Sequence, residues 1–371
     1  MRGTTHDFSL DEGDLCTERR GHGRAHVAGR TTADDHQTRR RHTSRVREAH
    51  RYPERVPELR HDALTGRLVL LASSRSSRPI STGSLVAARD TRAAGTRSPC
   101  PFCPGHESET PPEVARTGDG APGEPGWRVR VFPNLYPIVG GEDASTGATG
   151  AHEVVTLSPD HDRAFGELSH DEAAEVLGML RDRAAVHLGN GREHVQGLVN
   201  QGRAAGASIA HPHAQVLALD FVPPAVTVAT ERFAAAGADL VAADLDDALQ
   251  RDQGIVLGDE VAAWCPTGSA TPYEVRVAAR GAGPRFDQAS DAHVLGVAVV
   301  LRDVLAAVAS ALDDPPYNVV VHSADPGAGR YHWWVEVTPR TAVVAGFEIG
   351  TGVLVNSVDA ADAAAALRAV R

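Results

Sequence analysis

The spacing of apolar residues predicts two series of elements that follow the same order along the chain. In the first series, strands are expected over 127–139 and 152–158, then an amphipathic helix over 169–189, then two strands with a glycine-rich turn between them over 195–219. Ser169 precedes the helix as an N-cap, and acidic residues fill its first turn. A shorter apolar strand at Leu68–Leu71 follows the turn "LTGR" near the start of the ordered region.

The second series repeats this order. It consists of a strand within 265–280, a helix over 290–312 with Ser290 as its N-cap, and a strand, loop and strand over 317–340. Self-similarity at this scale indicates duplication of a unit in which helices pack on a sheet. The expected fold is therefore α+β, with antiparallel sheets packed with helices in two tandem half-domains, at 57–222 and 223–371.

Residues 1–56 show no such period. They are rich in Arg and His and poor in large apolar residues, which predicts a disordered tail. The net charge of -11 argues against broad nucleic-acid binding. No uninterrupted apolar run approaches the roughly 18 residues of a membrane span, and the N-terminus has no apolar signal core. We therefore expect a cytoplasmic protein that binds neither nucleic acid nor membrane.

The basic residues are all arginine, because the sequence contains no lysine. This excludes Schiff-base lysines, P-loop lysines and lysine-adenylate intermediates. Any phosphate group must therefore be bound by arginine, histidine, backbone amides, hydroxyl groups or a metal ion.

The stretch "SIAHPHAQVLAL" contains the most specific polar pattern. In a strand, alternate side chains share a face, so His211, His213 and Gln215 are expected to point the same way. A neutral imidazole can carry a nucleotidyl group between two acceptors, and His213 is placed for this role. Gln215 and Ser208 could then hold phosphoryl oxygens. Polar histidines on an exposed strand, or a metal-binding His-x-His pair, are the alternatives.

Cys100 and Cys103 form a CxxC pair, which suggests a metal site in a chain without a secretory signal. Two thiolates can hold one tetrahedral zinc ion while other ligands come from distant strands. His211 is expected to be the third ligand and His152 the fourth, with His106 and His161 as rivals. Packing of two free thiols in a loop is the alternative.

Four separated segments resemble the galactose-1-phosphate uridylyltransferase family, a duplicated branch of the histidine-triad superfamily. They are "CPFCPGHESETPPE", "VRVFPNLYPIV", "NQGRAAGASIAHPHAQ" and "AGFEIGTG". The resemblance implies two tandem histidine-triad-like half-domains and a double displacement. The residue matching His213 would take UMP from UDP-glucose as a covalent uridylyl-histidine, and galactose 1-phosphate would then accept it.

The resemblance also implies roles for other residues. Gln215 would bind phosphoryl oxygens, and Cys100, Cys103, His152 and His211 would hold one structural zinc ion per chain. Substrate contacts would come from Arg75, Arg78, Asn134 and Asn200. Some relatives have a second metal site, but Trp334 stands where a histidine would be required, so we expect no second metal. A homodimer is also implied.

Three alternatives remain open from the sequence. A phosphorylase acting on ADP-glucose or on a dinucleoside polyphosphate would use the same His213 and Gln215. A hydrolase is less favoured, because Gln215 stands where small histidine-triad hydrolases have a third histidine that can donate a proton. A noncatalytic zinc-stabilised binding protein would predict a degenerate site, whereas His213, Gln215 and Ser208 are all present.

Overall fold

The computed structural model describes residues 56–77, 100–140 and 149–371. The predicted tail therefore lies almost entirely outside the described residues, as does Arg78. Within the described residues, ten strands form one antiparallel sheet in the order β3-β4-β5-β7-β6-β11-β12-β10-β9-β8. In chain order these strands are β3 (Ala115–Gly118), β4 (Trp127–Pro133), β5 (Gly150–Thr156), β6 (His194–Gln201), β7 (His213–Leu219), β8 (Gly254–Leu257), β9 (Val261–Trp264), β10 (Val275–Ala279), β11 (Tyr317–His322) and β12 (Trp334–Pro339).

The two predicted series of strands join edge to edge in this sheet. β6 of the first series pairs with β11 of the second, with Asn200 opposite Asn318. The Asn318 side-chain Nδ2 also donates to Asn200 Oδ1 at 2.7 Å. The α+β class with antiparallel strands and helices is confirmed, but the sheets of the two series are one continuous sheet. Residues 52–371 form one compact unit, and the boundary at 222/223 stays a prediction.

A separate three-stranded sheet is formed by β1 (Glu58–His61), β2 (Leu68–Leu71) and β13 (Leu354–Asn356). The helices are α2 (His170–Gly189), α3 (Pro224–Ala236), α4 (Leu240–Gln250), α5 (Asp291–Leu312), α6 (Gly346–Thr351) and α7 (Ala360–Arg368). Short 3-10 helices are η1 (Ser73–Ser77), η2 (Glu107–Glu109), η4 (Phe165–Glu167), η5 (Arg203–Ala205) and η6 (Phe286–Gln288).

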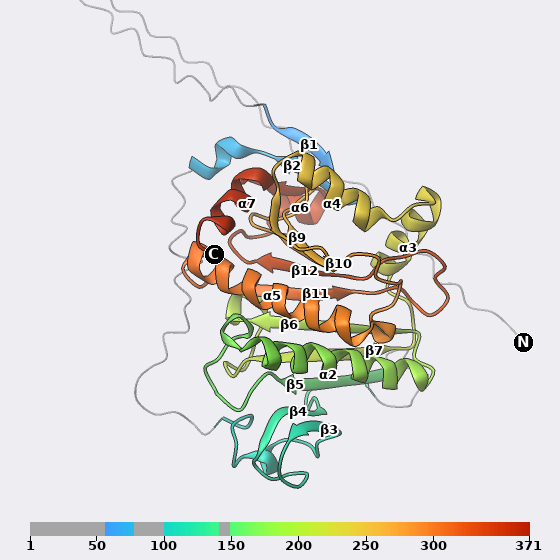
Figure 1. Cartoon of the computed structure of the whole chain (residues 1–371), viewed down its shortest axis with the longest axis vertical. Coiled ribbons are helices and arrows are strands. Elements are labelled where there is room, and N and C mark those ends of the chain that lie inside the picture. Colours follow the sequence, from blue (N-terminus) through green and yellow to red (C-terminus); the bar gives the residue numbers. More distant parts are fainter. Residues whose placement is uncertain (1–55, 78–99, 141–148) are drawn as a thin grey trace, which may run out of the picture. The chain divides into compact units, whose positions relative to one another are not determined.

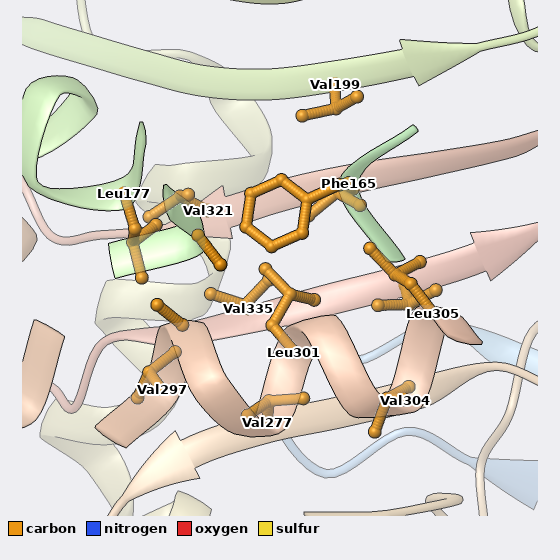
Figure 2. Close-up of a cluster of buried hydrophobic side chains, with 14 of the residues drawn as sticks. Phe165, Leu177, Val199, Val277, Val297, Leu301, Val304, Leu305, Val321 and Val335 are labelled. Carbon is orange, nitrogen blue, oxygen red and sulfur yellow. The ribbon is translucent and has the colours of Figure 1, made fainter. Parts of the chain in front are cut away.

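Helices α2 and α5 lie side by side across one face of the large sheet (Figure 1). Both begin at the predicted N-caps, since the Ser169 and Ser290 side chains accept hydrogen bonds from the first turns. Their apolar residues meet those of the strands in the main core (Figure 2), where Leu177 of α2 and Leu301 of α5 join Val199, Val321 and Val335. Burial of this face fixes which strand residues point toward the helices and which point away.

Helix α5 also meets the length and composition of a membrane-spanning helix. Its 22 residues include a window with a mean hydropathy of 2.0, half of which is buried inside the structure. Polar residues such as Arg302 and Asp303 interrupt its apolar residues, so α5 contains no uninterrupted apolar run of that length. In the structure, the buried side of the helix packs on α2 and on strands β9 and β10, as expected for a core helix.

The other face of the sheet differs between the two series. In the second series, α3 and α4 contribute to an apolar cluster on this face that includes Phe233, Trp264, Tyr331 and Trp334. In the first series, the corresponding face carries only a small cluster of Phe102, Phe132 and Val154. Polar side chains of β5 and β7 lie beside this small cluster, and they form the candidate site.

Candidate active site and metal-binding group

Strand β7 directs its polar residues away from the helices. Ala214, Val216 and Ala218 point into the main core, so His213 and Gln215 lie on the opposite face. This part of the predicted pattern is confirmed. His211 precedes the strand, and its orientation is set by the loop that leads into β7 rather than by strand alternation.

The His213 ring is held in one tautomer. Its Nδ1 donates to the carbonyl oxygen of His211 at 2.9 Å, so the lone pair of the neutral ring is on Nε2. Among the described residues, no group is hydrogen-bonded to that Nε2. Burial lowers the pKa of His213 below its usual range, against the opposing effect of the hydrogen bond to His211. The ring is therefore neutral near pH 7 and has the form that a nitrogen nucleophile needs.

An aromatic side chain supports the nucleophile candidate from one side. The Phe102 ring lies 5.4 Å from the His213 ring in an edge-to-face arrangement, and it packs against Phe132 at 5.2 Å. Phe102 was not among the residues predicted from the sequence. Only its position inside the CxxC segment "CPFC" could have indicated this contact. A residue between two candidate metal ligands must lie close to the other side chains around that site.

Four side chains converge beside Phe102: Cys100, Cys103, His161 and His211. Their ligand atoms all lie within 4.8 Å of one another, so the group could hold a metal ion. His211 Nε2 donates to the Ser158 carbonyl at 2.9 Å, which leaves Nδ1 unprotonated at 3.6 Å from the Cys103 sulfur. A backbone carbonyl that fixes the tautomer in this way is typical of metal-binding histidines. Burial lowers the pKa of His211 to about 4, so its lone pair stays available.

The structure contradicts the choice of His152 as the fourth ligand. His161, one of the two rivals, occupies that place, with Nδ1 at 3.3 Å from the Cys103 sulfur. His152 lies on β5 opposite Leu217 of β7. Thr156, four residues later on β5, is the residue opposite His213. The rest of β5, residues 153–156, separates the His152 backbone from the loop that carries His161, and His211 lies in the loop before β7. The sequence could not distinguish the two because loop 158–165 determines where His161 points.

His152 instead contacts the other candidate catalytic side chain. Its Nε2 lies 2.7 Å from Gln215 Oε1 and 3.2 Å from Asn134 Nδ2. Asn134 also donates its backbone N–H to the His152 carbonyl at 2.7 Å. Asn134 lies in the turn that follows β4, and Gln215, His152 and Asn134 form one polar group on the same face as His213.

The remaining predicted residues lie in different places. Ser208 is exposed in the loop between η5 and β7. Asn200 is on β6 and accepts from Asn318, which also donates to the Ala205 carbonyl at 2.8 Å and so holds the base of that loop. Arg75 is exposed in η1 after the small sheet, and no contact in the described part of the chain joins it to His213.

In the second series, the corresponding face of the sheet is covered by aromatic side chains and by a network of charged side chains. Trp334 is fully buried on this face and stacks on His322 at 4.4 Å, whereas its neighbour Trp333 points the other way, into the main core beside Phe286. Beside Trp334, Arg276 Nη2 is 2.7 Å from Asp62 Oδ2, and its Nη1 is 2.9 Å from Asp244 Oδ2. These side chains have the chemistry of a buried ion network, and none resembles the open nitrogen of His213.

The site thus combines a sheet covered by helices on one face with a neutral, tautomer-fixed histidine on the other face, an arrangement suited to nucleophilic catalysis. Residues 144–223, which include β6 and β7, match the model of the galactose-1-phosphate uridyl transferase N-terminal domain. Over these residues the chain is similar to the galactose-1-phosphate uridylyltransferase family, which its motifs also resemble.

Particular relatives cover more of the chain. The ADP-glucose phosphorylase of Arabidopsis thaliana is 29% identical over 340 residues, which cover 85% of this chain and 93% of that protein. Its crystal structure with bound ADP-glucose superimposes with a TM-score of 0.74 over 85% of this chain and 99% of that one. The galactose-1-phosphate uridylyltransferase of Streptomyces lividans is 30% identical over 186 residues, covering 48% of this chain and 47% of that protein.

Proposed function

We propose that this protein transfers a nucleotidyl group from a nucleotide sugar through a covalent intermediate on His213. In the first step, the Nε2 lone pair forms a bond to the α-phosphorus, and the bond from that phosphorus to the bridging oxygen breaks. Sugar 1-phosphate leaves with the bond electrons. In the second step, an oxygen of the acceptor phosphate forms a bond to the same phosphorus, and the bond to Nε2 breaks.

The observation that carries this proposal is the state of the His213 ring. A backbone carbonyl holds the proton on Nδ1, burial keeps the ring neutral, and Nε2 is open on the face that also carries Gln215. A nucleophilic histidine needs these three properties together. Gln215 supplies amide donors for a nonbridging oxygen, and the exposed loop with Ser208 supplies a hydroxyl group and backbone amides.

We infer that ADP-glucose is the donor and inorganic phosphate the acceptor, which would yield ADP and glucose 1-phosphate. The support is the similarity to ADP-glucose phosphorylase, which extends over most of both chains. Transfer of UMP from UDP-glucose to galactose 1-phosphate, the assignment first favoured by the sequence motifs, is the second candidate. Its support is the family model over 144–223 and the half-length match to a uridylyltransferase.

A structural zinc ion completes the proposal. Cys100, Cys103, His161 and His211 offer two thiolate sulfurs and two imidazole nitrogens, a donor set that zinc accepts in tetrahedral sites. The ion would tie the CxxC segment to the loops before η4 and β7. It would thereby fix Phe102 against His213, without itself taking part in either chemical step.

The test is intact-mass spectrometry of the full chain after incubation with ADP-glucose or with UDP-glucose, in separate samples without an acceptor. An adenylyl adduct on His213 that inorganic phosphate discharges as ADP would support the phosphorylase. A uridylyl adduct that galactose 1-phosphate discharges as UDP-galactose would support the second candidate.

The variant His213→Ala should form no adduct with either nucleotide sugar, because the substitution removes the proposed nucleophilic nitrogen. Absence of any adduct in the unaltered protein, with zinc present in the site, would contradict the proposal. An adduct that persists in His213→Ala would show that a different residue is the nucleophile.

A further inference from the structure

We propose that His152 is a positioning residue that orients the Gln215 side-chain amide so that its NH₂ group faces the phosphoryl oxygens. This inference rests on the proposed function, since it concerns the same site. An amide side chain has an acceptor end and a donor end of nearly equal shape, and only the donor end stabilises an anionic oxygen. Something must therefore select one of the two orientations.

The selection begins with a backbone amide. The N–H of Ile138 donates to His152 Nδ1 at 3.3 Å, so the proton of the neutral ring lies on Nε2. That Nε2 then donates to Gln215 Oε1 at 2.7 Å. Asn134 Nδ2 lies 3.2 Å from the same Nε2, and because both nitrogens are donors in this tautomer, that longer contact is not a hydrogen bond. Burial lowers the pKa of His152, which favours this neutral form. One N–H group of the chain backbone thus determines the tautomer, and the tautomer determines which end of the amide His152 binds.

The consequence for Gln215 is that its donors remain for the substrate. In the described part of the chain, only His152 is hydrogen-bonded to the Gln215 side chain. Gln215 is partly exposed, and it lies two residues after His213 on the same face of β7. With Oε1 held by His152, the NH₂ group is free to donate on the side where the nucleotidyl group would be transferred. Donors oriented before the substrate arrives need no reorganisation during the reaction.

His152 is itself held rigidly. Its side chain is 6% exposed, and its backbone is fixed in β5 between β4 and β7. The turn after β4 closes over it, with Asn134 Oδ1 accepting from the Tyr136 backbone N–H at 2.9 Å. The same turn brings the Ile138 N–H to the ring. Asn134, expected from the sequence to contact substrate, is therefore part of the structure that holds His152.

The test compares His152→Leu with His152→Gln in single-turnover measurements of adduct formation on His213. Leucine fills a similar volume without a donor, and it should slow adduct formation by roughly 10–100-fold with a smaller change in substrate affinity. Glutamine can accept from Ile138 and donate to Gln215, so it should restore much of the rate. His194→Leu is the matched control, because His194 is also buried on this sheet, at 2% exposure, and it pairs in register with Leu219, four residues beyond Gln215.

A double-variant cycle separates positioning from a general structural role. In a Gln215→Ala background, His152→Leu should cause no further slowing, because the group that it orients is gone. Equal slowing in both backgrounds, or no slowing in either, would overturn the proposal. If the unaltered protein forms no adduct, the proposed function fails instead. Nitrogen-15 NMR of the His152 ring tests the tautomer independently of any activity measurement. A proton on Nδ1 rather than on Nε2 would overturn the proposal.

Discussion

His211 and His213 are two residues apart and carry their protons on opposite ring nitrogens. The Ser158 carbonyl holds the proton of His211 on Nε2, and the His211 carbonyl holds that of His213 on Nδ1. One ring therefore offers Nδ1 to the cysteines and the other offers Nε2 to the open face. At the scale of single residues, the difference between the candidate metal ligand His211 and the proposed nucleophile His213 depends on two backbone carbonyl groups.

The same geometry predicts which histidine substitution removes the metal. His161→Ala should remove most of the bound zinc and lower the melting temperature, because it deletes one of four converging ligand atoms. His152→Ala should retain zinc, since His152 contacts Gln215 instead. Plasma mass spectrometry of the two purified variants measures this difference, and retention by His161→Ala together with loss by His152→Ala would restore the assignment made from sequence.

At the scale of elements, the start of α2 matters because this helix covers the back of β6 and β7. Ser169 and Glu172 form a reciprocal cap: Glu172 N–H donates to Ser169 Oγ at 3.2 Å, and Ser169 N–H donates to Glu172 Oε2 at 2.7 Å. Arg163 pairs with the same carboxylate. These hydrogen bonds, that from Arg163 first, lower the pKa of Glu172 to about 2.

This cap gives the stability of the protein a defined dependence on pH. Because the folded pKa lies below the ordinary value of 4.5, the contribution is complete above about pH 4.5 and is lost as the pH falls toward 2. Glu172→Gln should lower the free energy of unfolding by about 1 kcal/mol at pH 7, given partial exposure of the pair. Urea titrations should show the difference vanishing near pH 2. Asp171→Asn, in the same helical turn but outside the cap, is the control.

At the scale of the whole molecule, the second series of elements is organised around buried charges. Asp62 follows β1, Asp244 lies on α4, and Arg276 of β10 pairs with both. Arg67 adds contacts to Asp62 and to Glu336 of β12, each at 3.0 Å. These ion pairs thus join distant segments of the chain. Each charged side chain depends on its partner, because an unpaired charge in this interior would be strongly unfavourable.

Removal of the central cation should therefore be costly. Arg276→Leu should lower the free energy of unfolding by about 3–5 kcal/mol, because it leaves buried carboxylates uncompensated. Urea denaturation measures the change. Arg251→Leu is the matched control: Arg251 pairs with Asp247 at 2.9 Å but is 56% exposed, so its loss should cost about 1 kcal/mol or less. Equal effects of the two substitutions would contradict the assigned role of the network.

Local patterns predicted the parts of this structure that depend on local contacts. Strand alternation identified the face shared by His213 and Gln215, and the serine caps located the starts of α2 and α5. The parts that were missed depend on distant contacts. His161 is placed beside the cysteines by the conformation of its loop, and Phe102 contacts His213 although the two residues are far apart in the sequence. The pairing of β6 with β11 has no signature in the sequence of either strand. The cytoplasmic location and the homodimer stay predictions.

The pairing of β6 with β11 also means that the duplicated halves are not separable modules. If the chain were divided between β7 and α3, each fragment would end its sheet in a strand with a free row of backbone donors and acceptors. Such edges associate with other strands, including copies of themselves. The half that carries His213 would also lose Asn318, which holds the loop at Ala205. The second half thus provides the strand that pairs with β6 and the side chain that holds the loop leading to His213.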